Sequence, residues 1–156
     1  MTSYIAVCGA GMAAARPADL QAAAEVGRRV AEAGGIVVCG GLGGVMEAAC
    51  RGARSADGVT VGLLPGVDRG DANPFVSVAI PTGIGELRNG LVVRAADVVI
   101  AIGGEWGTLS EIALAVKTGT PVVGIDTWDL DRPGIEVAAD ADAAVKRALA
   151  LASHSH

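Results

Sequence analysis

The chain has 156 residues, of which 51% are hydrophobic and 3% aromatic, and its formal net charge is −5. This length suits one domain, over residues 1–152, followed by a short tail at 153–156. The negative charge and the lack of a Lys/Arg run exclude a general nucleic-acid binder, and no uncharged apolar stretch approaches the roughly 20 residues that a membrane span needs.

Apolar segments of strand length alternate with helix-period segments in the first half of the chain. Residues 4–8 and 36–39 are continuously apolar, which is typical of strands buried on both faces. Pro17 suits the first position of a helix between them. A second predicted helix follows the glycine-rich loop 40–44, and residues 59–64 form a third strand.

The same alternation continues in the second half, where residues 98–102 are the most apolar strand candidate. A polar loop at 68–73 follows the third predicted strand. The pattern predicts further strands at 76–80, 121–125 and 135–138, helices around 87–95 and 109–116, and a last helix capped by Asp140.

Alternating strands and helices of these lengths predict an α/β fold with a doubly wound, Rossmann-like parallel sheet of six or seven strands in a three-layer α/β/α arrangement. Ligands of such folds bind beyond the carboxyl ends of the strands. Three glycine-rich loops, at residues 9–11, 40–44 and 103–107, fall at that edge. We therefore expect the ligand site there.

The glycine-rich loops favour a small phosphorylated ligand, such as a nucleoside 5′-monophosphate. Glycine lets the backbone approach a ligand closely, and a helix start offers unpaired N–H groups to a phosphate. A nicotinamide-binding dehydrogenase is disfavoured, because Cys39-Gly40-Gly41 stands where an acidic residue would bind ribose. The loop glycines expected at the site are Gly9, Gly11, Gly40, Gly41, Gly43, Gly44, Gly103, Gly104 and Gly107.

The cysteines indicate a reduced compartment. Cys8, Cys39 and Cys50 are odd in number and lack C-x-x-C spacing, so we expect a cytoplasmic protein without disulfides and with Cys39 in the core. No convincing metal-ligand cluster is visible in the sequence, and His154 and His156 belong to a Ser/His tail.

One segment is specific enough to indicate a family. Gly103-Gly104-Glu105-Trp106-Gly107-Thr108-Leu109-Ser110-Glu111, preceded by Arg88, resembles the G-G-x-G-T-x-x-E motif and the arginine of the Lonely Guy family, often labelled lysine decarboxylase-like. Its characterised members are cytokinin-activating phosphoribohydrolases. Residues 40–46, ending in Met46, are similar to the family's glycine-rich segment, and order and spacing agree over residues 4–125.

The resemblance implies catalytic roles for Arg88 and Glu111, which would cleave the N-glycosidic bond of a nucleoside 5′-monophosphate without a required cofactor. The unusually apolar composition, together with the dimers or larger assemblies of related proteins, predicts a homo-oligomer, a dimer or tetramer, for which we expect an interface on the helices around 87–93 and 109–116. Besides the glycines, the residues expected to line the ligand site are Met46, Asn89, Trp106 and Thr108.

Departures from the enzyme pattern leave a second hypothesis open. Ile102 stands where the family motif has proline, and Asn89 follows the arginine where the family has lysine. These features resemble a short branch that includes molybdenum cofactor carrier proteins, which bind a phosphate-bearing pterin. The alternative to hydrolysis is therefore a non-catalytic carrier of molybdenum cofactor, or a nucleotide sensor.

Two site residues also have structural interpretations. Thr108 and Glu111 fit a capping box, in which both side chains satisfy the first N–H groups of a helix. Arg88 has the alternative of a solvated residue near a helix start. The sequence leaves these alternatives open.

Overall fold

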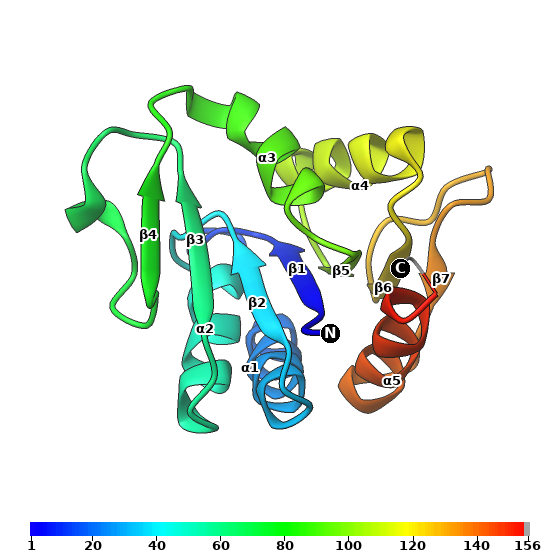
Figure 1. Cartoon of the computed structure of the whole chain (residues 1–156). Helices are drawn as coiled ribbons and strands as arrows, with labels where there is room; N and C mark the ends of the chain where they lie inside the picture. The colour runs from blue at the N-terminus through cyan, green and yellow to red at the C-terminus, as the bar shows by residue number, and fades with distance from the viewer. Residues whose placement is uncertain (155–156) are drawn as a thin grey trace.

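A parallel sheet forms the centre of the structure (Figure 1). The computed structural model describes residues 1–154 and confirms the predicted α/β fold, with seven strands in the order β4-β3-β2-β1-β5-β6-β7. The strands are β1 (Tyr4–Gly9), β2 (Ile36–Cys39), β3 (Thr60–Leu64), β4 (Val78–Pro81), β5 (Val98–Ile102), β6 (Val122–Ile125) and β7 (Glu136–Val137).

Helices cover both faces of this sheet (Figure 1). On one face lie α1 (Pro17–Glu32), α2 (Val45–Ser55) and α5 (Ala141–Ala152), and on the other lie α3 (Asn89–Arg94) and α4 (Trp106–Thr118). Two short 3₁₀ turns are η1 (Arg69–Asp71) and η2 (Gly85–Arg88). Residues 155 and 156, in the predicted tail, lie outside the described residues.

Most element boundaries follow local chemistry. Pro17 opens α1, and the Asp140 side chain accepts a hydrogen bond from Ala143 N at the start of α5, as predicted. Two helix predictions need correction. The helix expected around 87–95 is divided into η2 and α3, and α4 begins at Trp106, ahead of the Thr108 start that a capping box requires.

Alternate residues of the central strands divide between two apolar cores. Ile5 and Val7 of β1 pack with the helices α1, α2 and α5, while Ala6 and Cys8 pack with α3 and α4. The larger core is built almost wholly from Ala, Val and Ile, which agrees with the low aromatic content. Cys39 is buried, as predicted, with its Sγ 3.5 Å from Cys50 Sγ.

Helices α1 and α2 approach so closely that their backbones touch. A Cβ added at Gly27 would lie 1.9 Å from the Ala49 carbonyl oxygen, and one added at Gly52 would lie 1.8 Å from the Ala24 carbonyl oxygen. Small residues therefore set the distance between these helices. Their contact holds the loops that precede both helices, at the carboxyl edge of the sheet.

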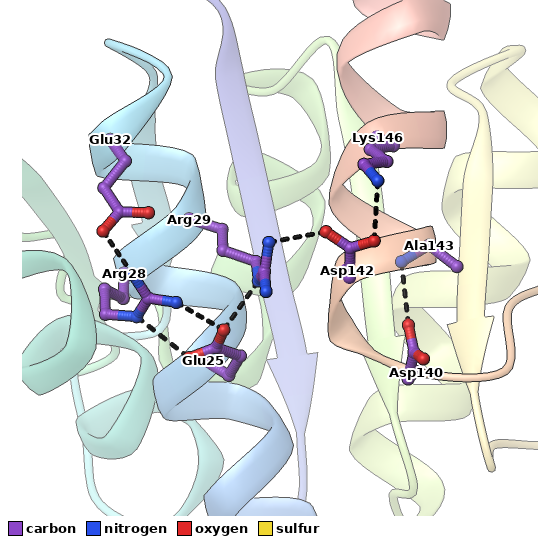
Figure 2. A network of polar contacts seen from close by, with 8 residues as sticks. All are labelled: Glu25, Arg28, Arg29, Glu32, Asp140, Asp142, Ala143 and Lys146. Atoms are coloured by element: carbon purple, nitrogen blue, oxygen red, sulfur yellow. Dashed lines mark hydrogen bonds and ion pairs between the residues drawn. The ribbon is translucent and has the colours of Figure 1, made fainter.

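An ion pair joins α1 to α5 within a network of charged side chains (Figure 2). Arg29 Nη1 lies 2.5 Å from Asp142 Oδ1, and the same carboxylate pairs with Lys146 Nζ at 2.8 Å. Glu25 bridges Arg28 and Arg29 on α1 (Figure 2). Because these side chains are partly exposed to solvent, the ion pairs add little stability, and the apolar faces of both helices stabilise the contact.

Several large apolar side chains are exposed on the α3–α4 side, among them Leu87, Leu91 and Val116. They lie on the segments where the sequence places a subunit interface, and the homo-oligomer stays a prediction. Over residues 1–154, none of the helices combines the length and the apolarity of a membrane span.

The α1–α2 contact predicts that Gly27→Ala destabilises the protein. Alanine is the better helix former by about 1 kcal/mol, but its methyl group would overlap the Ala49 carbonyl, and overpacking typically costs about 1–3 kcal/mol. Urea unfolding should therefore show a lower free energy of unfolding. Gly90→Ala in α3 is the matched control, because its Cβ meets only Leu114 at 4.0 Å. Equal stability of the two variants would contradict this packing.

Candidate ligand-binding site

A pocket of about 190 Å³ opens at the carboxyl ends of β1 and β5. These strands are neighbours in the sheet, with Gly9 paired to Ile102, and the chain order of the strands reverses between them. Doubly wound folds bind their ligands at this switch point, because the loops that follow the two strands diverge to opposite faces. The pocket therefore lies where the fold favours a ligand.

The pocket brings together segments that are distant in sequence. The loop after β1, the turn η2 and the first turns of α4 all contribute to its lining. The sequence-predicted residues that line it are Gly9, Gly11, Met46, Arg88, Asn89, Gly107, Thr108 and Glu111. Cys8, Glu86 and Glu105 also line it, and sequence reasoning did not identify them as site residues.

The second glycine-rich loop supports the pocket from outside its lining. A Cβ at Gly40 would lie 2.7 Å from Arg88 Nη2, so this glycine makes room for the guanidinium. Gly44 has φ +70° and lies against the Ala10 carbonyl, which also accepts a hydrogen bond from Val45 N. Gly41 and Gly43 likewise do not line the pocket.

Arg88 is a buried cation, with 8% of its surface exposed. Its Nη1 donates to Asn89 Oδ1, and Asn89 Nδ2 donates to Ser110 Oγ at 3.1 Å, which ties the guanidinium to α4. Its Nε is buried and has no hydrogen-bond partner within the described residues. Across residues 1–154, none of the ion pairs includes Arg88. The solvated alternative for Arg88 is therefore wrong.

Glu111 lies on α4 and lines the same pocket with 7% of its surface exposed. Burial raises the pKa of its carboxyl from 4.5 to about 7, against the opposing effects of a hydrogen bond from the Cys8 thiol and of the Arg88 charge. The pKa of the Cys8 thiol is raised well above its ordinary value, mainly by burial and to a smaller extent by the neighbouring Glu111 carboxylate. Near neutral pH the pocket thus holds a neutral thiol and a partly protonated carboxyl.

The capping-box interpretation of Thr108 and Glu111 is wrong. Because Glu105 is the N-cap and Trp106 the first residue of α4, Thr108 is already inside the helix and is not its N-cap. Thr108 is buried and, with Gly107, lines the pocket. The first turn of α4 therefore presents its backbone to the pocket, and a helix N-terminus favours bound anions.

A second pocket of about 350 Å³ adjoins the first and shares Ala10 and Glu105 with it. Gly103 and Gly104 line this second pocket. Trp106 lines neither: its side chain is 75% exposed, with its ring centroid 5.3 Å from that of Trp128. The two pockets together follow the carboxyl edge of the sheet.

Comparisons with known proteins agree with this architecture. The molybdenum cofactor binding protein of Rippkaea orientalis is 35% identical and superposes with a TM-score of 0.91 over 97% of this chain and 98% of that one. The molybdenum cofactor carrier protein of Chlamydomonas reinhardtii is 34% identical, with a TM-score of 0.89 over 97% and 99% of the two chains. These likenesses confirm the predicted branch.

A sequence relative and a family model complete the comparisons. An uncharacterized protein of Archaeoglobus fulgidus is 43% identical over 101 residues, which are 65% of this chain and 66% of that protein. The model of the SLOG cluster4 family matches residues 2–152. Since this match spans nearly the whole chain and includes every residue of the pocket, the chain belongs to the SLOG cluster4 family.

Proposed function

We propose that the protein binds a small phosphorylated ligand of the molybdenum cofactor class and carries it without chemistry. The phosphate would bind in the pocket between β1 and α4, against the Arg88 guanidinium and the N-terminal turn of α4. The observation that carries this proposal is a buried cation that forms no ion pair with any carboxylate of residues 1–154 and whose Nε has no hydrogen-bond partner there.

A buried guanidinium that lacks an anionic partner is costly, because it loses hydration without gaining a compensating charge. A phosphate at the pocket would supply this charge and accept hydrogen bonds from the planar fork of Arg88, including its unpartnered Nε. The site is therefore organised for an anion before the ligand arrives.

Backbone groups supply the remaining recognition. The N-terminal turn of α4 carries N–H groups that the helix itself leaves unpaired, and Gly107 and Thr108 of that turn line the pocket. Local donors of this kind explain how a protein of net charge −5 would hold a phosphate.

The size of the site and the comparisons support the ligand class. About 190 Å³ is less than most small-molecule sites occupy, so the first pocket suits the phosphate and the adjoining pocket offers room for the rest of the ligand. The whole-chain likeness to two molybdenum cofactor proteins favours a pterin that carries a phosphate.

One observation favours a second candidate, a phosphoribohydrolase. A pocket carboxyl such as Glu111, with a pKa near 7, is a common feature of general acids and bases. A hydrolase would use Glu111 on the ribose of a nucleoside 5′-monophosphate. Only the hydrolase would convert the nucleotide and water into a free base and ribose 5-phosphate.

Binding of molybdenum cofactor tests the main proposal. We expect calorimetry with anaerobically prepared cofactor to show binding that weakens at least about tenfold in Arg88→Ala, since charge-assisted hydrogen bonds contribute about 1.5–3 kcal/mol. Arg51→Ala is the matched control, because Arg51 is exposed on α2 and away from the pocket. Equal losses in both variants, or no binding, would overturn the proposal.

Chromatography decides between carrier and hydrolase. Incubation with nucleoside 5′-monophosphates should leave them intact if the protein is a carrier. Release of a free base that disappears in Glu111→Gln would instead establish the hydrolase. Glu105→Gln is the control, because Glu105 lines the same pocket but is exposed.

The raised pKa of Glu111 also predicts how stability depends on pH. Between about 4.5 and 7 the folded carboxyl retains a proton that the unfolded one has lost, so this group stabilises the fold at low pH and the contribution disappears as pH rises through 7. Urea unfolding should show that Glu111→Gln gains about 2 kcal/mol relative to wild type between pH 5 and pH 8. Parallel pH profiles would mean that the pKa is not raised.

A further inference from the structure

We propose that the Glu111 carboxyl and the phosphate of the bound ligand share one proton, so that Glu111 acts as a ligand-binding residue and phosphate binding near neutral pH takes up a proton. This inference rests on the proposed function, because it requires a phosphate in the pocket. It assigns Glu111 a role that a carrier needs, in place of the catalytic role that the family resemblance implies.

The geometry of the pocket carries the inference. Glu111 and Arg88 are both more than nine-tenths buried and line one small space, yet the structure shows no ion pair between them among its described residues. The Cys8 thiol lines the same pocket, and a thiol is only a weak hydrogen-bond donor to a carboxylate. A phosphate that reaches Arg88 in this pocket would therefore come close to Glu111.

An ionised Glu111 would oppose such a phosphate. Two negative groups in contact at a buried position repel each other strongly, because the local dielectric screens them poorly. One proton between the two groups removes the repulsion and adds a hydrogen bond, as it does when two carboxylates share a site. Burial already favours the protonated carboxyl in the free protein.

Other polar groups surround Glu111 in the pocket. From β1 the Cys8 thiol faces the carboxyl, and its raised pKa keeps it neutral. From η2 come the permanently charged Arg88 and the exposed Glu86, and Glu105 precedes α4. The remaining polar groups of the pocket, on Asn89 and Thr108, do not ionise.

The proton balance gives the inference a measurable form. Above about pH 7 a free phosphate monoester is a dianion, because its second pKa is about 6, and Glu111 is increasingly ionised. Binding then takes one proton from the solvent and holds it between a carboxyl oxygen and a phosphate oxygen. No covalent bond between heavy atoms forms or breaks, and affinity should fall about tenfold for each pH unit above 7.

Calorimetry with ribose 5-phosphate between pH 7 and pH 9 tests this. In wild type we expect the affinity to fall about tenfold per pH unit, and two buffers of different ionisation enthalpy should reveal uptake of about one proton at pH 8.5. In Glu111→Gln the amide donates to the dianion without any proton, so the affinity should not change with pH and should exceed that of wild type at pH 8.5. Glu32→Gln, the matched control, removes an exposed carboxylate on α1 outside the pocket and should keep the wild-type slope.

Each outcome bears on one of the two proposals. A wild-type affinity that does not depend on pH, no proton uptake, or the same slope in Glu111→Gln would overturn the shared proton. Failure of ribose 5-phosphate to bind at any pH would also overturn it, whereas binding of molybdenum cofactor through Arg88 would still support the proposed function. Proton uptake is measured on the unmodified protein, so the test does not depend on how well the variant folds.

Discussion

The guanidinium of Arg88 is the constraint to which the rest of the site is fitted. It lies buried at the switch point of the sheet, and no carboxylate of residues 1–154 forms an ion pair with it. Gly40 leaves space for it, and Asn89 links it to the first turns of α4 through Ser110. The anion that we propose as ligand would supply the charge that offsets the cost of burying this guanidinium.

The surrounding fold keeps that cation in place. Loops after β1 and β5 diverge from adjacent strands, and the contact of α1 with α2 through Gly27 and Gly52 holds the loops that precede these helices. Glu111 is held beside the cation by the same helix whose N-terminus faces the pocket. Charge, backbone donors and a protonatable carboxyl thus converge on one small volume.

The fold could be predicted from the sequence because its signals are local: continuously apolar segments indicate buried strands, glycine-rich loops mark the ends of strands, and Pro17 marks the start of a helix. The grouping of Arg88, Thr108 and Glu111 came from motif resemblance, and the structure places them in one pocket. The local sequence gave a wrong start for α4. Thr-Leu-Ser-Glu matches the pattern of a capping box, but the helix begins at Trp106. Cys8 lines the pocket and affects the pKa of Glu111 because the two residues are buried together. The sequence spacing of Cys8 and Glu111 does not reveal this tertiary contact.

A crystal structure of the complex with molybdenum cofactor would test the central claim most directly. The account predicts the cofactor's phosphate within hydrogen-bond distance of the Arg88 guanidinium and of the backbone N–H groups at the start of α4, with Glu111 in contact with a phosphate oxygen. A phosphate bound elsewhere, with the Arg88 Nε still unpartnered, would contradict it.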